Sequence, residues 1–226
     1  MIGIIAAMES EMNILREALN CNATRIHSID FYEGVIGKTE IVLCSSGVGK
    51  VNAAMAATIM IDTFECELII NTGIAGGITG VETKDIVLAT GAMYSDVDAT
   101  AFGYAYGQIP QMPKIFLPSS THIVEVKRVL KHLGFSYKEA LVYSGDSFVS
   151  RLSQVSNVDT SNPCIAEMEG AAIAQVCTKA GRDFIILRYI SDCIGKPNQI
   201  EDYQKFESEM SERSSRICLE ILKNLA

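Results

Sequence analysis

Short apolar runs alternate along this chain with segments whose apolar positions recur at helical spacing. The runs predict strands at residues 2–8, 40–44, 67–71, 85–89, 140–143, 164–167 and 183–190, with a hairpin around Glu33 and Gly34. The helical spacing predicts helices at residues 9–20, 48–64, 124–133, 170–179 and about 203–225. Because such alternation is typical of parallel strands covered on both faces, we expect an α/β fold. The expected architecture is a single domain over residues 1–226, with a central mixed, largely parallel twisted sheet flanked by helices.

One stretch departs from this regular alternation. Residues 95–120 contain several residues that interrupt helices and strands, namely Gly103, Gly107, Pro110, Pro113 and Pro118. A loop of that length inside a compact domain is usually functional. We therefore expect this segment to take part in binding or assembly.

Composition and charge narrow the class of ligand. The 226 residues are 48% hydrophobic and 20% charged, with a net charge of −8, which is an ordinary globular balance. Lys and Arg form no cluster, whereas a nucleic-acid binder would usually present a basic face. The sequence therefore indicates a small neutral or zwitterionic substrate, and no nucleic acid.

Three further features indicate the cellular compartment and the capacity to bind metals. They are the cysteines, the histidines and the N-terminal residues. Seven cysteines form no CxxC pair, and their odd number excludes a complete disulfide framework, so we expect reduced thiols. The three histidines occur in unrelated contexts, so we expect no zinc or other metal site. Residues 1–8 are too short an apolar run for a membrane span and lack a preceding basic segment. These features predict a cytoplasmic protein without membrane contact.

Two glycine-containing segments invite a phosphate-binding interpretation. The first, residues 45–50, is not a P-loop, because Cys44 stands where that loop needs glycine and Val51 where it needs a hydroxyl. The second, residues 71–77, follows an apolar run without the GxGxxG spacing. Its glycines would permit close approach of a ligand to the main chain, or would simply make a tight turn. Spacing alone leaves both interpretations open.

Three carboxylates are candidates for chemistry because each follows or ends an apolar run: Glu11, Glu169 and Asp192. Strands of a parallel sheet end at one rim, so these groups can meet in one cleft. Taken singly, each is more often a helix cap or a surface charge. An aromatic ring such as Phe148 can stack on a flat base, although core packing is the commoner role of a single Phe.

Together these segments resemble the bacterial 5′-methylthioadenosine/S-adenosylhomocysteine nucleosidases, of the nucleoside phosphorylase-like superfamily. The resemblance runs over nearly the whole chain. It includes residues 2–11, 46–50, 71–77, 144–148, 167–169 and 188–192, and it is most specific in residues 100–110. The segments 167–169 and 191–192 also occur in related nucleoside phosphorylases.

The resemblance implies a role for each matching residue. Asp192 corresponds to a general acid for adenine N7, Glu11 to the base that orients the attacking water, and Glu169 to the residue that holds the ribose hydroxyls. The implied binding residues are Met8, Val48, Phe148, Val149 (through its main chain), Met168, Arg188 and Tyr203, together with Phe102, Tyr104 and Pro110. The last three match a loop that completes the neighbouring subunit's pocket, so the resemblance implies a homodimer.

The implied reaction is hydrolysis of the N-glycosidic bond of methylthioadenosine and S-adenosylhomocysteine, which releases adenine. An acid must protonate the departing base, and a carboxylate must activate water on the opposite face of the sugar. No metal or organic cofactor is required. One position departs from the family, because Ile74 stands where relatives often carry a small hydroxyl residue near the acid. An isoleucine would make the surroundings of that acid drier and cannot donate a hydrogen bond to it.

Three other functions are compatible with the same segments. A purine nucleoside phosphorylase needs an anion site, and Glu11 in the N-terminal turn would repel phosphate. The sequence alone does not distinguish a nucleosidase for a futalosine-type substrate from one for methylthioadenosine. A non-catalytic nucleoside-binding protein is the third alternative, since fold does not guarantee activity. The presence of all three carboxylates favours the nucleosidase.

Overall fold

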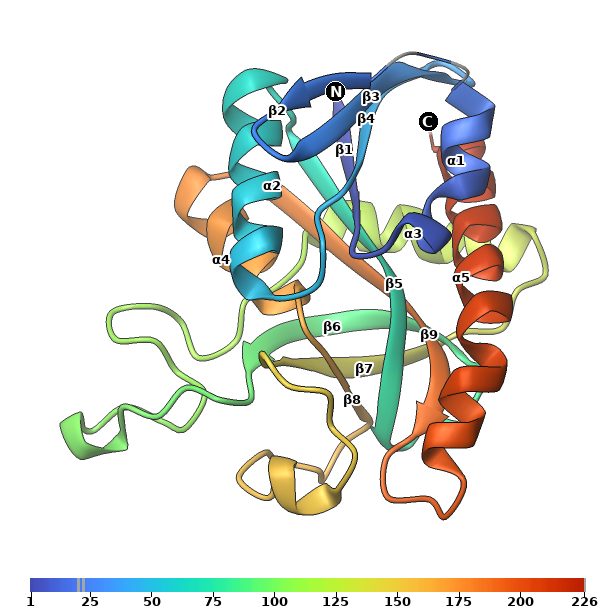
Figure 1. Ribbon diagram of the computed structural model, residues 1–226. Helices are drawn as coiled ribbons and strands as arrows, with labels where there is room; N and C mark the ends of the chain where they lie inside the picture. Colours follow the sequence, from blue (N-terminus) through green and yellow to red (C-terminus); the bar gives the residue numbers. More distant parts are fainter. Residues whose placement is uncertain (20, 22, 226) are drawn as a thin grey trace.

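The computed structural model describes residues 1–19, 21 and 23–225, and within them the strands form one mixed sheet (Figure 1). The strands are β1 (Ile2–Ala6), β2 (Ala23–Ile26), β3 (Ile29–Ile36), β4 (Thr39–Ser45), β5 (Leu68–Thr79), β6 (Ile86–Tyr94), β7 (Lys138–Ser144), β8 (Cys164–Glu167) and β9 (Asp183–Cys193). The helices are α1 (Asn13–Leu19), α2 (Lys50–Thr63), α3 (Ser120–His132), α4 (Gly170–Ala180) and α5 (Gln199–Asn224). Short 3₁₀ turns are η1 (Glu9–Glu11), η2 (Thr100–Phe102) and η3 (Leu152–Val155).

The sheet closes on itself over part of its width. Its order is β2-β3-β4-β1-β5-β8-β7-β6-β9, and β9 also pairs with β5, so five strands form a ring while β1 to β4 extend from it. Parallel pairs include β1 with β4 and β5 with β9; β5 with β8 and β6 with β9 are antiparallel. The expected α/β fold with a mixed sheet is confirmed, but its closure was not predicted, because apolar runs do not specify which strands pair.

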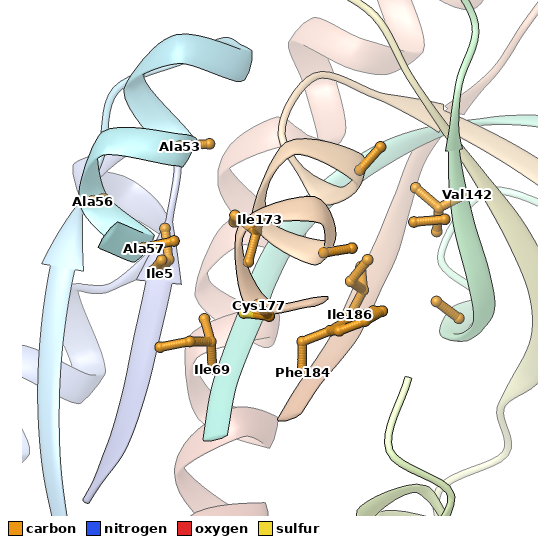
Figure 2. Packing of buried hydrophobic residues seen from close by; sticks show 14 of the residues in the cluster. Ile5, Ala53, Ala56, Ala57, Ile69, Val142, Ile173, Cys177, Phe184 and Ile186 are labelled. Atoms are coloured by element: carbon orange, nitrogen blue, oxygen red, sulfur yellow. The ribbon is translucent and has the colours of Figure 1, made fainter. Parts of the chain in front are cut away.

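Helices cover both faces of the sheet (Figure 1). On one face, Ala53, Ala56 and Ala57 of α2 lie beside Ile173 and Cys177 of α4, next to strand side chains of the core (Figure 2). The small side chains of α2 let this helix approach α4 closely. On the other face, α1, α3 and the long α5 pack over a second apolar cluster. In the part of the chain that the structure describes, no helix is long and apolar enough to cross a membrane.

Several predicted boundaries were wrong. The helix predicted over residues 9–20 is divided into η1 and α1 within residues 9–19. Asn20 lies outside the described residues, as does Ala226 of the predicted domain. The hairpin of β3 and β4 turns at Gly37 and Lys38, where Gly37 has φ 65°, while Glu33 and Gly34 lie within β3. Strand β2 was not predicted because it is short and mostly exposed, so it carries no apolar signal.

The interpretation of residues 71–77 as a turn was also wrong, because they continue strand β5 to Thr79. Instead, the glycines leave room for side chains from neighbouring segments to pack against the strand. A Cβ on Gly77 would lie 2.7 Å from Cγ2 of Val81, and one on Gly73 would lie 2.5 Å from Oε1 of Glu11. Glycine in a strand often marks such close approach. The segment thus carries β5 directly into the candidate site.

Candidate active site

A cleft opens at the rim where β1, β5, β8 and β9 bring their carboxyl-terminal residues together. It encloses about 610 Å³ of space not filled by protein, including its open mouth. The predicted residues that line it are Met8, Glu11, Val48, Phe148, Val149, Met168, Glu169, Asp192 and Tyr203; Ala7, Ile74, Ala75, Gly76, Ser147, Ala166, Glu167, Ser191 and Ile194 complete the wall. The structure therefore brings all three candidate carboxylates into one cleft.

Glu11 is held by main-chain donors on two sides. Its Oε2 accepts the N–H groups of Ala7 and Met8, both at 2.9 Å, and its Oε1 accepts that of Ile74 at 2.9 Å. Burial raises the pKa of Glu11, and these hydrogen bonds together with the charge of Arg188 partly oppose that rise. The side chain does close its own first turn, as the capping interpretation suggested. It also reaches the cleft, so the two roles coexist.

Glu169 stands at the N-cap position of α4 but does not cap that helix with its side chain. Its Oε1 accepts the N–H of Gly49 at 2.9 Å, at the start of α2, where the helix dipole favours negative charge. Burial and then the neighbouring charge of Glu167 raise the pKa of Glu169 to about 7, while Arg188 lowers it. Burial and the neighbouring Glu167 charge therefore favour the protonated form of this carboxyl.

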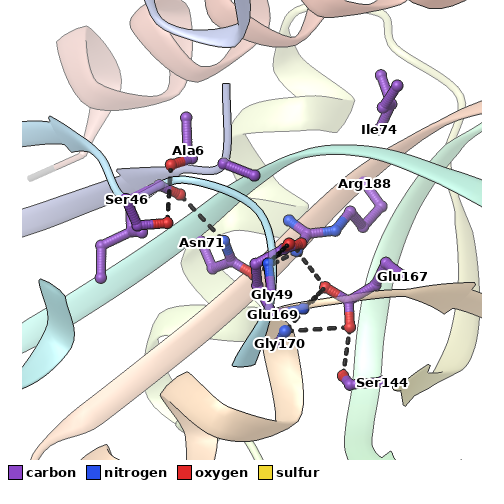
Figure 3. Close-up of polar contacts among 12 residues, drawn as sticks. Ala6, Ser46, Gly49, Asn71, Ile74, Ser144, Glu167, Glu169, Gly170 and Arg188 are labelled. Carbon is purple, nitrogen blue, oxygen red and sulfur yellow. Dashed lines mark hydrogen bonds and ion pairs between the residues drawn. The ribbon is translucent and has the colours of Figure 1, made fainter. Parts of the chain in front are cut away.

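Arg188 lies behind these carboxylates rather than in the cleft wall (Figure 3). Its guanidinium donates to Glu167 and Asn71, and Nη2 lies 3.8 Å from Oε2 of Glu169. Glu167 in turn accepts the N–H of Gly170 at 2.8 Å, so Glu167, not Glu169, caps α4. Arg188 is 1% exposed, and its charge is matched inside the protein. It orients the acidic groups and does not present a free cation to a ligand.

Asp192 lies in β9, one residue before the strand ends, and is 2% exposed. Its Oδ1 accepts the hydroxyl of Ser191 at 2.7 Å, and its Oδ2 accepts Nε2 of Gln199 at 2.8 Å. Burial raises the pKa of Asp192, these two hydrogen bonds lower it, and the charge of Asp202 raises it. The N-cap of α5 is Asn198, so the helix-cap interpretation of Asp192 was wrong.

The mouth of the cleft is apolar and aromatic. The rings of Phe148 and Tyr203 meet edge to face, with centroids 5.1 Å apart. Phe148 and Val48 are each about half exposed, whereas the carboxylates beneath them are buried. This arrangement leaves aromatic and apolar surface at the entrance and acid–base groups at depth.

Phe102, Tyr104 and Pro110 do not line this cleft. They lie in the long segment between β6 and α3, which extends away from the body of the protein (Figure 1). Phe102 is 83% exposed, an unusual position for a large apolar ring. Among the described residues, no group of three or more His, Cys, Asp or Glu side chains could hold a metal ion.

Two residues at the site were not singled out from the sequence. Gln199 contacts the Asp192 carboxyl, but glutamine in the first turn of a helix is ordinarily solvated, so no pattern marks it. Glu167 was quoted only as part of a motif. Its position two residues before Glu169, at the end of an apolar run, was the signal that could have identified it.

The fold and this cleft define a protein of the phosphorylase superfamily, whose sequence pattern matches residues 1–223. A nucleosidase from Halalkalibacterium halodurans is 41% identical over 228 residues, which cover 99% of this chain and 98% of that protein. The chain belongs to the 5′-methylthioadenosine/S-adenosylhomocysteine nucleosidase family.

Solved structures agree with this assignment. The S-adenosylhomocysteine nucleosidase of Streptococcus pyogenes, in complex with 5-methylthiotubericidin, is 39% identical with a TM-score of 0.93, over 100% of this chain and 97% of that chain. The futalosine hydrolase of Helicobacter pylori is also similar, with 27% identity and a TM-score of 0.90 over 99% of this chain and 97% of that chain.

Proposed function

We infer that this chain hydrolyses the N-glycosidic bond of 5′-methylthioadenosine and S-adenosylhomocysteine and releases adenine. One observation carries the inference beyond family membership. The described residues that line the cleft include four carboxylates, Glu11, Glu167, Glu169 and Asp192, and no Lys or Arg. Such a wall would repel phosphate as a nucleophile, whereas it can activate water. Hydrolysis is therefore supported over phosphorolysis.

Asp192 is proposed as the general acid. Adenine leaves poorly as an anion, so N7 must gain a proton as the bond to the ribose breaks. The raised pKa of Asp192 favours the protonated form that this step requires. Its hydrogen bonds to Ser191 and Gln199 fix the orientation of the carboxyl.

Glu11 and Glu169 are proposed to act on the sugar side. Glu11 is buried and held by three N–H groups, so its carboxylate has a fixed direction from which to orient a water molecule. The sugar develops positive charge as the base departs, which nearby carboxylates stabilise. Glu169 would bind the ribose hydroxyls, with Met168 beside it. Attack by water opposite the departing base gives inversion.

Phe148, Tyr203, Val48 and Met8 are proposed to enclose the base and the 5′-alkylthio group, and the main chain of Val149 to read the purine edge. Their place at the apolar mouth of the cleft supports this arrangement. Arg188 supports Glu167 and Glu169 from behind. The reaction needs no metal or organic cofactor.

A homodimer is proposed from the extended segment that carries Phe102, Tyr104 and Pro110. Its exposed ring and its distance from the chain's own cleft suit a segment that completes the cleft of a second copy. All seven cysteines are free thiols, which supports a reducing compartment such as the cytoplasm.

A substrate panel assayed with and without phosphate tests the function. Methylthioadenosine should give adenine and methylthioribose without phosphate. Formation of methylthioribose 1-phosphate, only when phosphate is present, would indicate a phosphorylase. A futalosine-type substrate belongs in the panel because of the similarity to the Helicobacter pylori hydrolase. Faster release of the base from that substrate would reassign the specificity.

A further inference from the structure

Gln199, the first residue of α5, connects two parts of the cleft wall. Its Nε2 donates to Oδ2 of Asp192 at 2.8 Å and to the main-chain oxygen of Val149 at 2.8 Å. Its Oε1 accepts the N–H of Gly195 at 3.0 Å. Gln199 is 3% exposed and does not line the cleft. The Gln199 amide therefore donates both of its hydrogens from outside the cleft, one to the Asp192 carboxyl and one to the loop that carries Val149.

The acid depends on this contact. Ile74 lines the same cleft, but its side chain has no hydrogen to donate. Among the described residues, the other hydrogen bond to the Asp192 side chain comes from Ser191, whose hydroxyl can donate or accept as the carboxyl gains or loses a proton. An amide nitrogen only donates. Gln199 thus favours a fixed orientation of Asp192, and its ionised form, in a way that Ser191 does not.

We propose that Gln199 is a positioning residue for the general acid: it orients the Asp192 carboxyl and holds it at a set distance from the Val149 carbonyl at the purine edge. The proposal rests on the proposed function, since it gives Asp192 the role of the acid.

Other titratable groups near Asp192 also influence its pKa, so a pH test must take them into account. Asp202 and Tyr203 of α5 interact electrostatically with Asp192, and Glu11, Glu167 and Glu169 share its cleft. None of these groups donates a hydrogen bond to Asp192 in the described residues. Removal of the Gln199 donor should therefore raise the pKa of Asp192, with the surrounding charges unchanged.

The test compares Gln199→Met with a matched control, Gln154→Met. Gln154 accepts the N–H groups of Ser150 and Arg151 at 3.0 Å and donates to the Phe148 oxygen, so it braces the same loop without touching Asp192. Turnover requires a protonated acid, so kcat falls as pH rises through the pKa of Asp192. This fall of kcat is the alkaline limb of the pH–rate profile. In Gln199→Met the alkaline limb should move up by about one pH unit, as expected for loss of one hydrogen bond to a charged group. Maximal kcat should fall about tenfold because the carboxyl loses its orientation.

Gln154→Met should leave the limb where the wild type has it, and so should any purely structural effect on the loop. Carbon-13 NMR titration of the Asp192 carboxyl in the ligand-free proteins gives the same pKa without catalysis. If the limb and the titration of Gln199→Met both coincide with those of the wild type, the proposal is overturned. If the wild type releases no adenine yet the Asp192 titration shifts in the variant, the proposed function fails and the positioning role stands.

Gln199→Glu provides a second variant should Gln199→Met not fold. Glutamate keeps the length and the acceptor for the Gly195 N–H, but it loses the amide donor and places a second carboxyl beside Asp192. The two adjacent carboxyls should titrate as a pair, with one pKa raised and the other lowered. An Asp192 carboxyl that titrates in Gln199→Glu as it does in the wild type would contradict the proposal on its own.

Discussion

Gly73 leaves the space in which the Glu11 carboxylate lies: a Cβ at position 73 would stand 2.5 Å from Oε1 of Glu11. Strand β5 thus passes beside Glu11 with no side chain between them, and the next residue, Ile74, donates its N–H to the same oxygen. The glycine matters here because a carboxylate from another element occupies the position of its missing side chain.

Gly73→Ala should move the end of the Glu11 side chain. Gly73 also has φ 154°, a conformation that alanine rarely adopts, so some loss of stability should accompany this displacement. In the folded fraction we expect kcat to fall by roughly 10²-fold, the lower end of the range for loss of general-base assistance. Steady-state assays of adenine release measure this. Gly134→Ala is the control: Gly134 has φ 74° and open space around its Cβ position, so its substitution strains the turn without touching the cleft. Equal loss of kcat in both variants would contradict the steric explanation.

Glu11→Gln should bind substrate and turn over slowly. Glutamine keeps the shape of the side chain and can still accept an N–H, but it cannot take a proton from water. General-base assistance contributes roughly 10²–10⁴-fold, so kcat should fall in that range. Calorimetric binding of adenine should remain close to that of the wild type. Near-normal turnover would remove Glu11 from the mechanism.

The raised pKa of Glu169 predicts a pH dependence of stability. The group titrates near 4.5 when unfolded and at about 7 when folded, so the folded state binds the proton more tightly. Its contribution to stability is therefore full below about 4.5 and is lost as pH rises through about 7. Glu169→Gln does not titrate, and its free energy of unfolding should fall less over this interval. Urea unfolding of both proteins between these pH values measures the difference; parallel curves would contradict it.

Phe102→Ser should weaken self-association. A ring that is 83% exposed on an extended segment gains stability only when another surface covers it. Sedimentation velocity should show a dimer for the wild type and a shift towards monomer for the variant, with loss of activity at low protein concentration. A wild-type monomer with full activity would contradict the composite cleft.

The sequence predicted the meeting of three carboxylates in one cleft better than it predicted the strands that form this cleft. Glu11, Glu169 and Asp192 were identifiable because each follows or ends an apolar run, and such runs become strands that end at one rim. The course of β5 was not predictable in the same way. Gly73 packs against Glu11, which is distant in sequence, so the local pattern is that of a turn.

Gln199 shows a second limit. Its role depends on three partners outside α5: the Val149 carbonyl on a loop, the Asp192 carboxyl on β9 and the N–H of Gly195. A single polar residue at the start of an amphipathic helix has no periodicity to reveal such contacts. The closure of the sheet through the β5–β9 pair was hidden for the same reason, since pairing is a relation between segments.

If Asp192 protonates the departing base, its replacement by asparagine should separate binding from cleavage. Asparagine preserves size and can donate a hydrogen bond to N7, but it cannot transfer a proton. Binding of methylthioadenosine and its single-turnover cleavage should be measured on the same folded preparation of Asp192→Asn. We expect nearly unchanged affinity and almost complete loss of adenine release. Turnover comparable to that of the wild type would show that Asp192 is not the acid and leave the general acid unassigned.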